Sequence, residues 1–123
     1  MEIEYSSDKT REQCNSVNAA KKLFGGDQTL VLKLMSRIKA LEAAENIKDI
    51  IVQKQFCFHD LKNKGKNSLE GFFAIDVKTR KEPWRIILRP LNQNREPYVP
   101  CDIDKIADEV TVIEIREVSK HYE

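Results

Sequence analysis

The sequence has few cysteines and lacks any long hydrophobic run. Its three cysteines, in 123 residues, are widely separated and form no C-x-x-C pair. This is typical of free thiols in a reducing cytoplasm and excludes a disulfide-rich secreted scaffold. The longest apolar runs, such as Phe72–Ile75, are too short to cross a bilayer, and no basic-then-apolar leader indicates export. We therefore expect a cytoplasmic protein with a single domain over residues 1–123 and no membrane partner.

Familiar catalytic motifs are also missing. There is no glycine-rich phosphate loop, no G-x-S-x-G elbow and no paired-carboxylate signature. The residues that could together bind zinc lack the close ligand spacing of zinc sites; they are Cys57, His59, Cys101 and His121. We therefore expect no metal and no cofactor, and any chemistry would depend on cations and imidazole.

The charge is unevenly distributed along the chain. The net charge is only +1, with 41% hydrophobic and 33% charged residues, which fits a soluble globular protein. Between Lys62 and Arg95, however, nine cations and three acids give a local charge of +6. Residues 96–123 carry three cations and eight acids, a charge of −5. The basic segment indicates a surface that faces a polyanion, or else a solvated lysine-rich face.

The first part of the chain has helical periodicity after a short strand at Ile3–Tyr5. Apolar spacing predicts two helices separated by Gly25-Gly26, with Asp8 and Asp27 as N-caps. Because the link is short, they should form an antiparallel hairpin over about residues 8–45. Their core-facing stripes are Cys14, Val17, Ala20 and Phe24, and Leu30, Leu34, Ile38 and Leu41; a short turn follows over 46–51.

From about residue 56 the apolar period changes to two, which predicts strands over residues 56–61, 73–77, from 84 and over 110–118. Pro90 cannot donate to a ladder, so its strand should be interrupted or lie at a sheet edge there. A polar insertion over about 92–109 has room for a short helix. Helices followed by strands predict an α+β fold with a mainly antiparallel sheet over about 56–123.

The strand that begins at residue 84 should present two sides. Trp84, Ile86 and Leu88 lie on one side, and Arg85, Ile87 and Arg89 lie on the other. The Cα atoms of the two arginines would be roughly 13 Å apart. Arginine's planar fork matches phosphate oxygens bidentately, so the pair suits two positions along a nucleic-acid backbone. The alternative is that one of them pairs with Asp76 or Glu114 across the sheet.

The last strand leads directly into a titratable cluster. Histidine exchanges protons near neutral pH, so His121 is a candidate general acid or base, and a solvated terminal histidine is the alternative. His59, beside the lysine-rich turn, is a second candidate, or a strand histidine bonded to a carbonyl. In regular pleating the last strand presents two sides: Ile113, Ile115, Ser119 and His121 on one, Lys120 and Tyr122 on the other.

Several segments together resemble the HigB toxins, the plasmid-maintenance killer proteins of the RelE/ParE superfamily. The shared features are His-x-Leu-Lys, Glu-Gly-x-x-x-Ile, Trp-Arg-Ile and a C-terminal strand ending in histidine. The resemblance implies a RelE/ParE-like fold, in which an N-terminal helical hairpin packs on a twisted antiparallel sheet. In this chain the shared features are His59–Lys62, Glu70–Ile75, Trp84–Ile86 and Val110–His121.

The resemblance implies the toxin of a type II toxin–antitoxin system, an mRNA endoribonuclease (mRNA interferase) that acts in the ribosomal decoding site without a metal. A ribose 2′-OH would attack the adjacent phosphate and leave a cyclic phosphate. By matched position His59 and His121 would transfer protons, Arg85 would stabilise the phosphate and Lys62 would orient the backbone. The expected RNA contacts, most of them supported by charge placement, are Arg89, Lys64, Lys66, Lys120 and Tyr122.

The resemblance also implies the partners of the protein. These are the ribosome, mRNA and a cognate HigA-like antitoxin with a helix-turn-helix. Operator DNA would be bound only by the toxin–antitoxin complex.

The chain departs from the family at two places. Related toxins often end Asp-Tyr-His where this chain has Ser119-Lys120-His121. Either Glu117 or Glu123 replaces the missing carboxylate, or Lys120 takes a different role. The 92–109 insertion is also longer than in compact members. Two other functions stay open: a non-catalytic inhibitor, as in the gyrase-poisoning ParE branch, and a small RNA-binding regulatory module.

Overall fold

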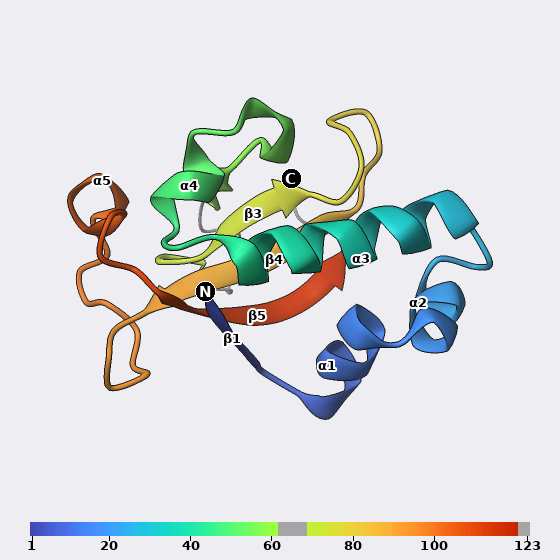
Figure 1. Ribbon diagram of the computed structural model, residues 1–123, viewed down its shortest axis with the longest axis horizontal. Coiled ribbons are helices and arrows are strands. Elements are labelled where there is room, and N and C mark those ends of the chain that lie inside the picture. The colour runs from blue at the N-terminus through green and yellow to red at the C-terminus, as the bar shows by residue number, and fades with distance from the viewer. Residues whose placement is uncertain (62–68, 121–123) are drawn as a thin grey trace.

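A five-stranded sheet with the strand order β1-β5-β4-β3-β2 organises the protein, seen in a computed structural model that describes residues 1–61 and 69–120 (Figure 1). β1 and β5 pair in parallel, and the other neighbours pair antiparallel. The predicted α+β class and mainly antiparallel sheet are confirmed. The strands are β1 (Glu2–Tyr5), β2 (His59–Asp60), β3 (Phe73–Asp76), β4 (Arg85–Leu91) and β5 (Val112–Ser119); the helices are α1 (Asp8–Asn15), α2 (Val17–Leu23), α3 (Gln28–Ala43), α4 (Lys48–Ile51) and α5 (Ile103–Ile106).

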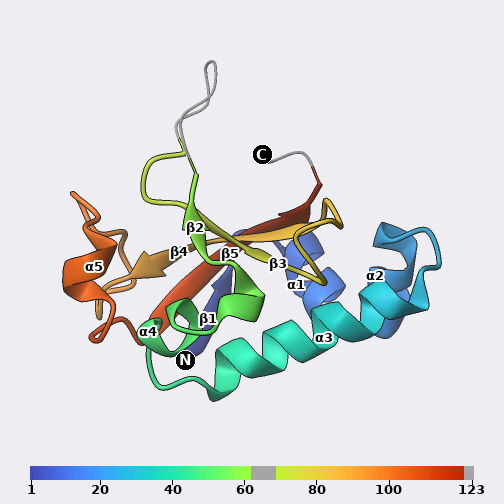
Figure 2. The same ribbon diagram turned by 90° about the horizontal axis from the view of Figure 1, so that it is seen from above.

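One face of the sheet is covered by α3, which runs beneath it in Figure 2, with α1 and α2 at one end. We call this the helix face; its buried side chains are Phe73, Ile75, Ile86, Leu88, Ile113, Ile115 and Val118. Leu34 and Leu41 of α3 are fully buried against this cluster. Burial of each such leucine stabilises the fold by about 1.5–3 kcal/mol, so α3 is tightly bound to the sheet.

The opposite side of the sheet, here called the outer face, carries a smaller apolar cluster and most of the strand charges. Ala74 and Ile87 pack there with Leu61, Leu69 and Phe72. Arg85 and Arg89 lie on this face as predicted, because they alternate with Ile86 and Leu88, which belong to the core under α3. The outer face is therefore the side of the sheet available to a ligand.

The first predicted helix is two helices. Ser16 has an extended backbone, ends α1, and its hydroxyl accepts a hydrogen bond from the Ala19 amide. Serine competes for backbone hydrogen bonds and favours an N-cap over a helix interior, which explains the break. The prediction that Val17 belongs to the core-facing stripe is therefore wrong. Val17 is the first residue of α2, and it is 50% exposed.

The strand predicted at 56–61 is much shorter than expected. Only His59 and Asp60 pair with β3, opposite Ala74 and Phe73. Before them, a 3-10 turn over Lys54–Phe56 ends at Cys57, whose backbone is left-handed with a φ of 49°. This turn places His59 at the β2 edge of the sheet.

β4 continues through Pro90, so the predicted interruption is wrong. Pro90 lies opposite Ile113 on β5, whereas β3 ends with Phe73 opposite Leu88. The proline thus has a strand neighbour on one side only within the described residues, which agrees with the edge alternative. The polar insertion after β4 contains the short helix α5, for which the sequence analysis found room. No helix among the described residues is long and apolar enough to span a membrane.

Candidate nucleic-acid interface

Two cross-strand rows bring predicted site residues into one half of the outer face. The first row runs His59, Ala74, Ile87 and Glu117 from β2 to β5, and the second runs Asp76, Arg85 and Ser119. Directly opposed residues in antiparallel strands share a face. His59, Arg85 and the end of β5 therefore converge, although three strand spacings, roughly 14 Å, separate His59 from Glu117.

Arg85 is used inside the protein. Its side chain is 2% exposed, and its Nε lies 3.1 Å from Oδ1 of Asp76, which is equally buried. The same guanidinium donates to the carbonyl oxygens of Trp84 (2.9 Å), Arg80 (3.1 Å) and Glu82. The ion-pair alternative is confirmed, and Arg85 closes the β3–β4 hairpin. A phosphate could contact this guanidinium only if the hairpin opened.

Arg89 is paired but remains accessible. Its Nε donates to Glu114 Oε1 at 2.8 Å, which confirms the same alternative for the second arginine. Its guanidinium also lies 4.9 Å from the centroid of the Phe72 ring. Since its side chain is 29% exposed, it can still contact an anion at the outer face.

Arg116 is a candidate that the sequence analysis missed. Its guanidinium lies 5.0 Å from the centroid of the same Phe72 ring, and its side chain is 39% exposed. It was overlooked because it lies within the acidic 96–123 segment. A signal was available in the sequence, because Arg116 alternates with the core residues Ile113 and Ile115 along the strand. This alternation predicts that the Arg116 side chain points away from the core.

His59 has one ring nitrogen occupied. Its Nδ1 lies 2.7 Å from the carbonyl oxygen of Cys57. A carbonyl only accepts, so this hydrogen bond places the proton on Nδ1 and leaves Nε2 of the neutral ring as an acceptor. The predicted carbonyl-bonded strand histidine is thus present, and the same bond prepares Nε2 to take a proton.

His59 lines an open groove of about 750 Å³ at the β2 edge of the sheet. Apolar side chains from α4, β3, α5 and the two residues that flank β2 share this groove with four carboxylates: Asp60, Glu70, Asp102 and Asp104. Such surroundings repel a phosphate, so RNA must approach His59 from the arginine side of the outer face. Among the residues that the structure describes, no group of three or more His, Cys, Asp or Glu could hold a metal ion.

A β-bulge at Arg116 reverses the sides of the sheet to which the following side chains of β5 point. Leu88 lies opposite Ile115 and Ile87 opposite Glu117, so Arg116 is the extra residue. Beyond it Val118 returns to the core, and Ser119 lies opposite Arg85 on the outer face. The prediction that Ser119 shares a side with Ile113 and Ile115 is therefore wrong, because regular pleating does not persist.

Lys120 lies beside the single tryptophan. Its Nζ is 5.6 Å from the centroid of the Trp84 ring, and the Phe24 ring meets Trp84 edge-on at 4.9 Å. The remaining predicted site residues, Lys62, Lys64, Lys66, His121 and Tyr122, lie outside the described residues, so their roles stay predictions.

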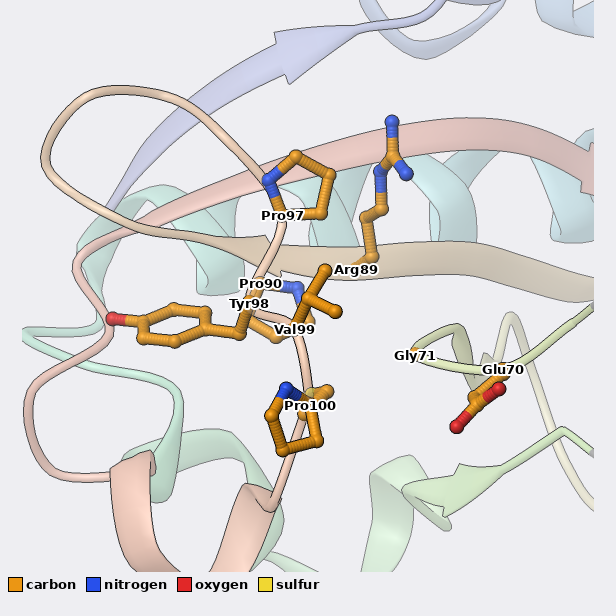
Figure 3. Close-up of a pocket in the computed structure, with 9 residues that line it drawn as sticks. Glu70, Gly71, Arg89, Pro90, Pro97, Tyr98, Val99 and Pro100 are labelled. Carbon is orange, nitrogen blue, oxygen red and sulfur yellow. The ribbon is translucent and has the colours of Figure 1, made fainter.

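Figure 3 shows a pocket of about 400 Å³ on the Arg89 side of the sheet. Pro97, Tyr98, Val99 and Pro100 form one side of it, and the Glu70–Gly71 segment lies across from them. Burial raises the pKa of the Tyr98 phenol, with smaller contributions from Glu109 and Cys101, so this hydroxyl stays protonated at neutral pH. With proline walls, Glu70 and an arginine already bonded to Glu114, the pocket is a poor phosphate site.

Comparisons with protein-family models, with curated proteins and with solved structures give no match to this chain.

Proposed function

We propose that this protein is a toxin of the HigB type in the RelE/ParE superfamily, a ribosome-dependent mRNA endoribonuclease. The motif order along the chain supports the family, and the order of helices followed by a mainly antiparallel sheet is compatible with it. The observation that carries the activity is the hydrogen bond between His59 Nδ1 and the Cys57 carbonyl, which prepares Nε2 as a base at the edge of a sheet face bearing Arg89 and Arg116.

In the proposed reaction, His59 Nε2 takes the proton of a ribose 2′-OH. The 2′-oxygen forms a bond to the adjacent phosphorus as the bond from phosphorus to the 5′-oxygen breaks. His121, by its match to the family, gives a proton to that leaving oxygen. The products are a 2′,3′-cyclic phosphate and a free 5′-OH, and no metal is required.

Charge that develops on the phosphoryl oxygens needs donors at the outer face. Arg89 and Arg116 are the described arginines of this face that combine a position over Phe72 with partial exposure. Loss of one such donor typically lowers the rate by about 10²–10³-fold. We assign this role to them in preference to Arg85, whose guanidinium is bonded within the β3–β4 hairpin.

The test is inducible expression of the wild-type chain, His59→Ala and His59→Gln in bacteria. We expect wild type to arrest growth and to create new mRNA 5′ ends, mapped by primer extension, and both variants to lose this activity. Circular dichroism would establish that they fold. Lys33→Ala, an exposed change on α3, is the matched control and should remain toxic. Undiminished cleavage by His59→Ala would exclude His59 as the base.

The buried position of Arg85 favours one alternative, a non-catalytic inhibitor of the ParE type, because it removes one of the expected catalytic groups from the surface. Growth arrest without new mRNA ends, and unaffected by His59→Ala and His121→Ala, would support that alternative. No growth arrest on expression without a partner would favour a small RNA-binding regulatory module.

The proposal includes a cytoplasmic location and the ribosome and mRNA as partners. It also includes a neighbouring gene for a HigA-like antitoxin with a helix-turn-helix, whose complex with the toxin binds operator DNA. Inspection of the two adjacent reading frames is the simplest check of this partner.

A further inference from the structure

A further concave site lies where β5 extends beyond the end of its neighbour β1. β1 ends at Tyr5, opposite Ile115, so the remainder of β5 borders α1. A pocket of about 380 Å³ opens there. The lining residues used below are Lys9, Gln13, Trp84, Arg116, Glu117 and Lys120.

The pocket is locally basic in a nearly neutral protein. Three of its lining residues are cations, Lys9, Arg116 and Lys120, and Glu117 is the acid among them. Lys9 and Lys120 are exposed and take part in no ion pair within the described part of the chain. Their ammonium groups are therefore available to an anion that enters from solvent.

The pocket also has an aromatic wall. Trp84 is half-buried, with the Phe24 ring edge-on at 4.9 Å and Lys120 Nζ at 5.6 Å from its centroid. An indole beside ammonium groups offers a stacking surface next to a phosphate site, which is the combination used for single-stranded nucleic acid. An acidic peptide would use the cations but would not need the indole.

The bulge on β5 builds this pocket. The hydroxyls of Ser6 and Thr10 donate to the Arg116 carbonyl at 2.6 and 3.2 Å, which anchors the bulge to the start of α1. Because Arg116 is the extra residue, Val118 enters the core and Lys120 comes to lie over Trp84. Regular pleating would reverse both side chains, so the cation–indole pair depends on this irregularity.

We propose that this pocket binds one nucleotide of single-stranded RNA, with its phosphate at Lys9 and Lys120 and its base against Trp84. This inference rests on the proposed function, since it assigns the pocket to the same RNA substrate. It makes Lys9 and Trp84 binding residues, a role that neither the motifs nor the family resemblance assigns to them.

Trp84 is the only tryptophan, so its fluorescence reports this pocket directly. The probe is a short single-stranded oligoribonucleotide with 2′-O-methyl riboses, which lacks the attacking hydroxyl and stays intact. We expect saturable quenching of Trp84 emission. Lys9→Gln and Lys120→Gln should each weaken binding several-fold and lower the slope of log K against log salt by about 0.7. Lys33→Gln on α3 should match the wild type.

RNA binding is also measured independently, by the anisotropy of a labelled oligonucleotide. This distinguishes RNA that binds elsewhere on the protein from RNA that binds at Trp84. Bound RNA without a change in Trp84 emission would overturn the inference, as would unchanged affinity of both lysine variants. Equal quenching by poly-glutamate would assign the pocket to an acidic protein segment. His59→Ala should bind RNA and quench like the wild type, so that loss of cleavage with intact quenching separates the proposed function from this pocket.

Discussion

At the scale of single residues, the two arginines of β4 share one face but have different roles. Arg85 is buried against Asp76 and three carbonyl oxygens, whereas Arg89 is paired with Glu114 at a partly exposed position. The sequence places both on the same side of a strand, and only their neighbours distinguish them. Substitutions at the two positions should therefore differ in kind.

Replacing Arg85 should destabilise the fold before it affects chemistry. Arg85→Met removes one partner of the buried Asp76 carboxylate and leaves the longer contact with Arg80 Nη1 at 3.7 Å; removing one partner of a buried pair typically costs about 3–5 kcal/mol. Urea unfolding would measure this loss. Arg11→Gln, which breaks an exposed pair with Asp8, is the control and should change stability by less than about 1 kcal/mol. A fully stable Arg85→Met would contradict a structural role.

Cys14 makes stability depend on pH in the alkaline range. Burial raises the pKa of its thiol from 9.0 to about 12. Above pH 9 the unfolded chain loses this proton while the folded chain keeps it, so the free energy of unfolding decreases as pH rises. The stabilisation is fully present below pH 9. Between about pH 8 and about pH 10.5 the loss should be roughly 2 kcal/mol.

Denaturant unfolding of the wild type and Cys14→Ala at both pH values isolates this contribution. Tyr5 decreases stability in the same direction, because burial, the largest cause, raises its phenol pKa, but it is present in both proteins. The alanine variant should therefore show a smaller loss with pH. Equal pH dependence in the two proteins would show that the Cys14 thiol is not protected by burial.

At the scale of secondary structure, three short polar side chains decide features that hydrophobic periodicity cannot. Ser16 divides the first helix by capping α2, and Thr10 with Ser6 holds the bulge at Arg116. Periodicity therefore located the helices and strands but missed this break and this reversal. Both depend on hydroxyl contacts, and the contacts at Arg116 span more than a hundred residues of sequence.

Removal of the Thr10 hydroxyl tests the anchor of the bulge. Thr10 is 5% exposed, and Thr10→Val keeps its shape while leaving the Arg116 carbonyl without this donor. We expect a loss of about 1 kcal/mol and amide chemical-shift changes over residues 116–119. The exposed Thr29→Val in α3 should stay within about 0.5 kcal/mol of the wild type. Unchanged shifts at 116–119 would show that Thr10 does not support the bulge.

At the scale of the whole molecule, helices cover one face of the sheet (Figure 2). The arginines over Phe72 lie on the other face. In the proposed function, the basic 62–95 segment would provide a further electrostatic attraction to RNA. We expect the protein to co-sediment with ribosomes at about 50 mM salt and to dissociate largely at about 200 mM, because phosphate contacts weaken steeply with salt.

His59→Gln should co-sediment with ribosomes like the wild type, since it keeps every cation. Co-sedimentation that is insensitive to salt, or absent at both concentrations, would contradict an interface built on phosphate contacts. Sucrose-gradient fractions probed for the protein would show whether the wild type and His59→Gln co-sediment with ribosomes at each salt concentration.

The sequence by itself determined the class of the fold, the helix-then-strand order and the alternation that puts arginines opposite the core, because these depend on periodicity and composition within short segments. It could not determine that Arg85 closes a hairpin, that Arg116 joins Arg89 over Phe72, or that a bulge brings Lys120 to Trp84. Each of these depends on contacts between different segments of the chain, and the last two join segments that are distant in sequence. Only the tertiary structure decides which polar groups are used inside the protein and which remain for a ligand.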